Sequence, residues 1–284
     1  MKIIISPAKK MNTNIETCEF KSLPILLERT EEILRWIQQL TYAEAKKLWK
    51  CNDKLAELNY RRFQEMDLRA NLTPAICSYE GLQYQYMAPQ IFTEDSLDYV
   101  QKNLRILSGF YGILHPFDGV TPYRLEMQAK ASITGCKNLY EFWGDKLYLQ
   151  VAGQKSAEKE SAEKKPAGEK PADQENADRD RVIINLASKE YSKCIEDYLT
   201  AEDLFITCVF GEKSGGKIIQ KGTRAKIARG EMVRFMAENN IKRAEEIKKF
   251  TRLEYAFSPA DSTENKYVFL TSSSKEQNGL QISV

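Results

Sequence analysis

Charged side chains that could bind an anion lie in residues 104–127, a block otherwise rich in glycine, proline, aliphatic and aromatic residues. In such an apolar setting Arg105, Arg124 and Glu126 need partners, and an Arg–Glu pair could simply satisfy itself. In the functional alternative, Arg124 and Tyr123 face a cleft and bind an anion or stack on a base. Glu126 then orients the arginine or acts as an acid or base.

Two predicted strand ends offer further polar side chains. Residues 2–5 are an apolar β-branched run stopped by a Ser-Pro pair, and Lys9 follows closely. Because open α/β sheets bind ligands beyond the carboxyl ends of their strands, Lys9 is a candidate contact for phosphate, although a solvated lysine explains it equally well. Residues 182–186 form another predicted strand, and Asn185 and Ser188 could bind a ligand at its end. Capping of the next helix also accounts for Ser188.

The strongest charge asymmetry lies in residues 213–252, which hold twelve Lys or Arg against four Glu. Helical spacing places Lys226 and Arg229 on one side of a predicted helix, with Arg234 nearby. Such a face suits phosphate binding, with an affinity that falls as salt rises. A solvated lysine-rich surface is the alternative interpretation.

The numbers of histidine and cysteine residues restrict which metal sites and catalytic groups the chain can form. His115 is the single histidine, so many zinc sites, two-His iron sites and Ser-His-Asp triads are excluded or reduced to one base. It stands beside a proline in an apolar turn, which favours a structural role. The six cysteines never form a C-x-x-C pair and are expected to be reduced, mostly buried thiols. We therefore expect no metal and no cofactor.

Length and composition indicate a globular protein. The chain has 284 residues, of which 42% are hydrophobic, enough to fill a substantial core. It contains no apolar run of about 18 residues and no signal-peptide h-region, so we expect neither a membrane span nor a secretory signal. The expected compartment is the cytoplasm.

Alternating helix and strand patterns predict an α/β fold. Predicted helices cover residues 24–39, 223–238 and 242–249, and others begin at Thr41 with capping-box spacing to Glu44, at Asn52 with Leu55, Leu58 and Tyr60 inward, at Thr93, and near residue 138. Predicted strands cover residues 2–5, 75–79, 104–107, 182–186 and 204–210, with edge strands at 253–257 and 266–270.

One internal segment differs in composition from the rest. Residues 154–180 contain no Ile, Leu, Val, Met or aromatic residue, and 14 of these 27 residues are charged. Such a stretch cannot bury enough apolar area to offset its ordering entropy. We expect a solvated, flexible insertion.

Six ordered motifs stand out along the chain: IISPAK at the start, LRILSGFYGIL followed by PFD, PYRLEM, NLYEFWGD, INLASKEY and ARGEMVRFM. Together they resemble the bacterial peroxide-stress protein family YaaA. The resemblance spans nearly the whole chain apart from residues 154–180.

The resemblance implies a single compact domain over residues 1–284, with a mixed sheet flanked by helices and sometimes described as cantaloupe-like. It implies a cytoplasmic protein that limits hydrogen peroxide damage, lowers free iron and binds double-stranded or distorted DNA through a positively charged cleft and a helix-hairpin-helix element. Carried over by motif, the DNA- or phosphate-binding candidates are Lys9, Arg105, Arg124, Lys226, Arg229 and Arg234, with Tyr123 and Glu126 beside them as candidate catalytic residues.

Two functions remain open at this point. The first is a DNA-associated peroxide-stress protein that recognises shape more than sequence. The second is an enzyme that acts on a nucleotide or nucleic acid in a cleft lined by Lys9, Tyr123, Arg124, Glu126, Asn185 and Ser188. Direct iron binding is disfavoured, because one histidine and no clustered cysteine leave mainly carboxylates as ligands. No membrane and no obligate protein partner are expected.

Overall fold

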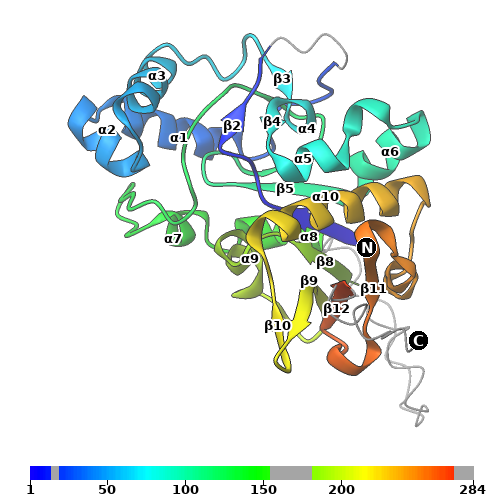
Figure 1. The fold of residues 1–284 in the computed structure, drawn as a ribbon. Coiled ribbons are helices and arrows are strands. Elements are labelled where there is room, and N and C mark those ends of the chain that lie inside the picture. The colour runs from blue at the N-terminus through cyan, green and yellow to red at the C-terminus, as the bar shows by residue number, and fades with distance from the viewer. Residues whose placement is uncertain (14–18, 154–180, 272–284) are drawn as a thin grey trace, which may run out of the picture.

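An eight-stranded mixed sheet forms the centre of the molecule (Figure 1). The computed structural model describes residues 1–13, 19–153 and 181–271, so the expected insertion at 154–180 lies outside the described residues. The strand order is β11-β12-β9-β8-β1-β5-β6, and β10 pairs with β9. The strands are β1 (Lys2–Ile5), β5 (Leu104–Ser108), β6 (Gly112–Leu114), β8 (Arg181–Leu186), β9 (Asp203–Ser214), β10 (Lys217–Ile219), β11 (Tyr255–Phe257) and β12 (Lys266–Thr271).

The middle of this sheet is parallel, and its central strand β1 is buried from Ile3 to Ile5. Strand β1 pairs in parallel with both β5 and β8, and β8, β9 and β12 continue the parallel run. Ile3, Ile4 and Ile5 have no exposed surface, as an apolar strand covered on both faces requires. The α/β fold with a mixed sheet flanked by helices is therefore confirmed.

Helices cover the sheet and extend beyond it. They are α1 (Leu27–Gln38), α2 (Tyr42–Trp49), α3 (Asp53–Gln64), α4 (Ala75–Ser78), α5 (Leu82–Met87), α6 (Glu94–Asn103), α7 (Leu139–Trp143), α8 (Lys146–Ala152), α9 (Lys189–Glu196) and α10 (Gly222–Glu238). The predicted N-caps at Thr41, Asn52 and Thr93 are confirmed, and Thr41 forms the full capping box with Glu44. In Figure 1, α10 lies beside α5 and α6 and crosses the sheet.

Two local predictions in the first half of the chain were wrong. Residues 75–78 form the short helix α4 rather than a strand, with Pro74 just before its first turn. This helix contacts β3 (Thr73–Pro74) and β7 (Gly119–Val120). Helix α3 buries Ala56, Asn59 and Phe63, whereas the predicted inward residues Leu55 and Leu58 are exposed. The burial pattern is thus shifted by one residue from the leucine positions.

Two further predictions need correction. Strand β12 lies between β11 and β9 and is not an edge strand, although β11 is. The predicted helix at 242–249 is a 3₁₀ helix, η4 (Ala244–Lys249). The predicted strand at 104–107 is confirmed as β5, and the segment between Ser108 and Gly112 connects it to the antiparallel strand β6.

Burial keeps two thiols protonated. Cys194 in α9 and Cys208 in β9 are buried, and this burial raises the pKa of each to about 12. No helix in the described part of the chain has both the length and the apolar character to cross a bilayer.

Candidate functional site

A cavity of about 390 Å³ opens where the parallel strands β1 and β8 end. Ser6 follows β1 and Ser188 follows β8, and the Ser6 hydroxyl accepts a hydrogen bond from the Ser188 backbone N–H at 2.8 Å. The Ser188 side chain makes no capping bond to α9, and its Oγ lies 3.2 Å from Ser6 Oγ instead. The predicted capping role of this side chain was wrong. The cavity, which we call the strand-end pocket, lies where open α/β sheets bind ligands.

Two glycines allow the walls of this pocket to approach closely. A Cβ on Gly230 in α10 would lie 2.1 Å from the backbone oxygen of Gln83 in α5. A Cβ on Gly109 would lie 2.5 Å from the backbone oxygen of Leu125. Any other residue would push these segments apart, since real Cβ atoms do not approach so closely. The first glycine brings α10 against α5, and the second fixes the loop that carries Arg124.

The structure brings four of the six predicted cationic candidates together. Lys9, Arg124, Lys226 and Arg229 all line the strand-end pocket, although they lie far apart in the sequence. Tyr123, Glu126 and Ser188 line it too. The predicted gathering of distant cationic residues around Arg124 therefore occurs for this set.

The other candidates lie elsewhere. Arg105 is buried, and its Nη1 donates to backbone oxygens, including that of Leu104 at 2.7 Å. Arg234 donates from Nε to Glu238 at 2.7 Å on the exposed side of α10. Asn185 is used within the sheet, where its Oδ1 accepts from the backbone N–H of Ala187 at 2.9 Å. None of the three lines the strand-end pocket.

Glu126 is held between two cations at the pocket wall. Its Oε1 lies 2.8 Å from Lys9 Nζ and 3.3 Å from Arg124 Nη2. The expected Arg124–Glu126 pair therefore forms, but Arg124 Nε is buried and has no hydrogen-bond partner among the described residues. One carboxylate does not satisfy both cations, and Arg124 retains an unused donor.

Glu190 is a second carboxylate of the pocket and stands in a different environment. Burial raises its pKa, and the nearby negative charge of Glu126 raises it further. Its Oε1 accepts a hydrogen bond from the backbone N–H of Gln128 at 3.3 Å. A carboxyl group of this kind can exchange a proton closer to neutral pH than an exposed glutamate can.

Tyr123 forms the buried floor of the pocket. Its hydroxyl lies 2.7 Å from the hydroxyl of Tyr79 and 2.6 Å from Ser108 Oγ. Burial raises its pKa, so the phenol stays neutral. These bonds occupy the hydroxyl, and the geometry favours a structural role for Tyr123 over that of a base.

Two residues of the site were missed in the sequence. Gln83 Nε2 is buried without a partner among the described residues, and Gln83 lines the pocket together with Glu190. Glu190 belongs to the motif INLASKEY, so its place two residues after a strand-end serine was the available signal. Gln83 gives no such signal, because only the contact between α5 and α10 brings it to the pocket.

Metal-ligand chemistry has little support in the described residues. They contain no group of three or more His, Cys, Asp or Glu side chains arranged to hold a metal ion. His115 lies outside the pocket, and its Nδ1 is 3.6 Å from the buried carboxylate of Asp118, which also accepts from the His115 backbone N–H at 2.8 Å. This geometry favours the structural interpretation of His115.

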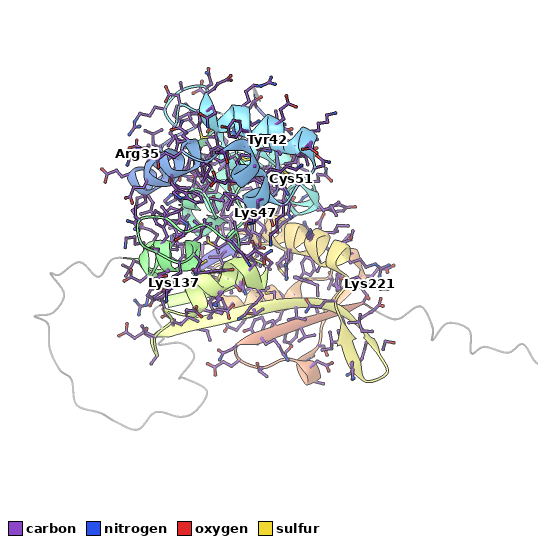
Figure 2. All side chains as sticks on the ribbon, turned by 90° about the vertical axis from the view of Figure 1, so that its left-hand side faces the viewer. Arg35, Tyr42, Lys47, Cys51, Lys137 and Lys221 are labelled. Atoms are coloured by element: carbon purple, nitrogen blue, oxygen red, sulfur yellow. The ribbon has the colours of Figure 1, made fainter. Side chains whose placement is uncertain are left out.

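Positive charge alone does not locate the site, since exposed cations occur on many elements. Figure 2 shows Arg35, Lys47, Lys137 and Lys221 projecting from separate parts of the surface. What distinguishes the strand-end pocket is the combination of concavity with buried donor groups that lack partners.

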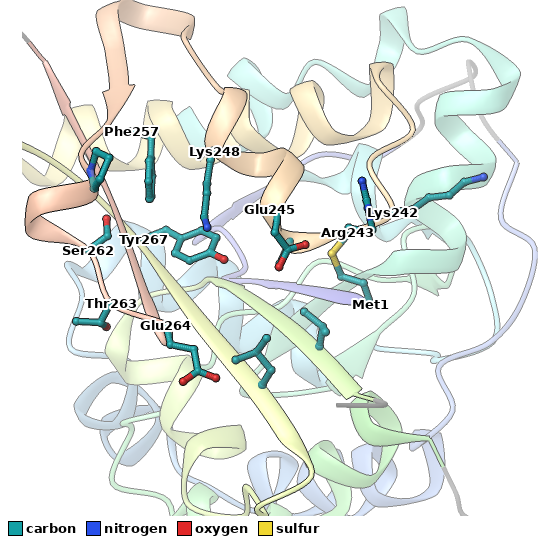
Figure 3. Close-up of a pocket in the computed structure, with 14 residues that line it drawn as sticks. Met1, Lys242, Arg243, Glu245, Lys248, Phe257, Ser262, Thr263, Glu264 and Tyr267 are labelled. Atoms are coloured by element: carbon teal, nitrogen blue, oxygen red, sulfur yellow. The ribbon is translucent and has the colours of Figure 1, made fainter. Parts of the chain in front are cut away.

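The basic stretch at 213–252 is divided between two cavities. Lys226 and Arg229 line the strand-end pocket, whereas Lys242, Arg243 and Lys248 line a wider cavity of about 1040 Å³ (Figure 3). In this second cavity the Lys248 ammonium lies 4.9 Å from the centre of the Tyr267 ring. The stretch therefore does not form one continuous basic face.

Fold and site together define an α/β protein with a cationic pocket at the carboxyl ends of two adjacent parallel strands. Residues 1–261 match the model of a family described as peroxide stress protein YaaA. The chain is 52% identical to a UPF0246 protein of Agathobacter rectalis and 50% identical to one of Lachnoclostridium phytofermentans. Each alignment covers 95% of this chain, with 98% and 96% of the respective relative. The chain belongs to the YaaA peroxide stress protein family.

Proposed function

We propose that this protein acts in the cytoplasm in the response to hydrogen peroxide, and that it binds DNA through the strand-end pocket and its basic rim. The observation that carries the proposal is the convergence of Lys9, Arg124, Lys226 and Arg229 on one concave site. Lysine and arginine side chains bind the sugar-phosphate backbone with little dependence on base sequence. Bound protein would shield the DNA from oxidative damage.

The charge balance of the pocket supports this proposal. Five cationic side chains line it against three carboxylates, an excess of two positive charges. The cations are Lys9, Lys10, Arg124, Lys226 and Arg229, and the carboxylates are Glu80, Glu126 and Glu190. Lys226 and Arg229 have no ion-pair partner among the described residues, so both are available to phosphate. An effect on free iron would be indirect, because the chain has one histidine and no C-x-x-C pair.

The test uses fluorescence anisotropy with a labelled DNA fork and the full chain. We expect salt-sensitive binding that Arg229→Glu weakens by about tenfold or more, with a log–log salt slope reduced by roughly one. The matched control is Arg234→Glu on the same helix, since Arg234 lies outside the pocket. Binding that is absent or independent of salt rejects the proposal.

A second candidate function is an enzyme that acts on a nucleotide or nucleic acid in the same pocket. The observation that favours it is the pair of carboxyl groups with different environments, Glu126 between two cations and Glu190 with a raised pKa. Glu126→Gln should then keep the fold and bind DNA at least as tightly, but lose the protection of cells against peroxide. Full protection by this variant argues against catalysis by Glu126.

A further inference from the structure

Three donor nitrogens of the strand-end pocket are buried without a hydrogen-bond partner among the described residues. They are Gln83 Nε2, Arg124 Nε and Arg229 Nε, from α5, the loop after β7 and α10. All three residues line this one pocket, whereas no side-chain atom of this kind lines the wide cavity of Figure 3. A folded protein rarely leaves such groups unpaired, because a buried donor without a partner loses its hydrogen bonds to water and gains none in return.

The chemistry of these groups indicates the ligand that would satisfy them. Each of the three atoms is a donor, and two of them belong to guanidinium groups. The matching ligand is therefore an anion with several acceptor oxygens. A phosphate group fits because it offers oxygens in several directions and pairs strongly with arginine.

The depth of the site restricts which phosphate can reach it. The Arg124 side chain is 13% exposed, and burial lowers the pKa of Arg229 through loss of solvation. The phosphodiesters of an intact duplex run along its surface, so they can reach the exposed rim cations Lys9 and Lys226. They cannot enter a cavity of about 390 Å³ with the rest of the helix attached. A phosphate at the end of a strand, or on a single nucleotide, can.

We propose that the strand-end pocket binds a terminal phosphomonoester, supplied by a DNA strand end or by a free nucleoside monophosphate. The proposal rests on the proposed DNA-binding function and assigns a ligand class to its pocket. The phosphate accepts hydrogen bonds from Arg124, Arg229 and Gln83. Lys226 and the other exposed cations of the rim contact the following sugar-phosphate.

Glu126 and Glu190 shape this recognition because both face the same pocket. An incoming phosphate competes with Glu126 for Arg124 and Lys9. It also adds negative charge near Glu190, which favours the protonated form of that carboxyl. Phosphate binding therefore favours proton uptake by Glu190.

The experiment compares two otherwise identical labelled duplexes, one with 5′-phosphate ends and one with 5′-hydroxyl ends, by anisotropy with the full chain. We expect the phosphorylated duplex to bind about tenfold more tightly, which corresponds to about 1.4 kcal/mol. Thymidine 5′-monophosphate should compete, whereas thymidine should not. If the nucleotide competes but the duplexes with 5′-phosphate and 5′-hydroxyl ends bind equally, the site is assigned to free nucleotides.

Variants of pocket residues test whether the preference for 5′-phosphate ends arises in the strand-end pocket. Gln83→Glu replaces an unpartnered donor with a carboxylate of nearly the same shape, and Arg229→Gln removes a cation. Both should abolish the preference for phosphate, while Arg234→Gln retains it, provided that thermal melting shows each variant folded. Equal affinity for phosphorylated and hydroxyl ends, with no competition by the nucleotide, overturns the proposal. Nucleotide binding without any DNA binding instead rejects the proposed function and leaves the phosphomonoester site intact.

Discussion

Glu190 shows how strongly a single residue depends on where folding places it. In the sequence it is one glutamate among many, but the fold half-buries it against Gln128 and near Glu126, and its pKa rises as a result. A carboxyl whose pKa is raised by folding stabilises the protein only while it is protonated. This contribution is fully present below the pKa of the unfolded chain, and it is lost as pH rises through the pKa of the folded state.

Glu190→Gln should therefore gain stability relative to the natural chain as the pH rises. Urea unfolding at about pH 4 and about pH 7.5 gives the free energy of unfolding of the variant and of the natural chain. The variant's advantage over the natural chain should be larger at the higher pH. Glutamine keeps the acceptor oxygen for the backbone of Gln128. Glu65→Gln, at an exposed site, is the control. If the variant differs from the natural chain by the same free energy at both pH values, the pKa of Glu190 is not raised by folding.

Site residues were predictable where a strand end or a helical spacing marked them. Lys9 follows the first strand, and Lys226 and Arg229 share one side of α10, so sequence reasoning selected all three. Arg105 was selected as a charged side chain in an otherwise apolar block, yet its guanidinium donates to backbone oxygens in the interior. Gln83 was missed because a neutral amide becomes informative only once its burial without a partner is known.

Helix–helix contact is the element-scale feature on which the pocket depends. Helix α10 meets α5 at Gly230, where no side chain separates them, and this contact places Arg229 beside Gln83. Helix α10 also packs on α6 and β9. The position of one helix thus sets both the pocket wall and part of the sheet covering.

Gly230→Ala should destabilise the protein although alanine is the better helix former. The helix gains up to about 1 kcal/mol from the substitution, but overpacking costs typically about 1–3 kcal/mol and moves α10 away from α5. We expect a lower melting temperature together with weaker phosphate binding. Gly222→Ala, at the start of the same helix and in open space, should cost nothing. Equal melting temperatures for the two variants would refute the packing argument.

Element boundaries followed local signals where those signals were strong. The caps at Thr41, Asn52 and Thr93 fixed helix starts correctly, because a side-chain acceptor at this position satisfies free N–H groups. The predicted strand at 75–79 failed, because β-forming residues in a short run respond more to their packing than to propensity. For α3, burial of Phe63 overrode the more obvious leucines.

The whole molecule depends on long-range strand pairing that no local pattern could predict. Strand β12 comes late in the chain yet pairs in parallel with β9, between that strand and β11. Its Phe269 stacks on Phe210 with ring centres 5.2 Å apart, and Phe250 and Phe257 complete the cluster. Strand β12 is therefore part of the core and not an appendage.

A chain that ends at Asp261 should fail to fold as a soluble protein. It covers the whole family match but lacks β12, so the edge of β9 and the ring of Phe210 become exposed. A chain that ends at Thr271 keeps every described element and serves as the control. The measurements are the soluble fraction on expression and the melting temperature. A fully folded shorter chain would show that β12 is dispensable.

The burial of Cys194 and Cys208 has a chemical consequence for a protein of this family. Oxidants attack the thiolate form of sulfur, and a pKa of about 12 leaves almost none of it at neutral pH. Both sulfurs should thus remain unmodified in mass spectra after exposure to the very stress in which the family is implicated. Oxidation should therefore leave the packing of β9 and α9 around these two sulfurs intact.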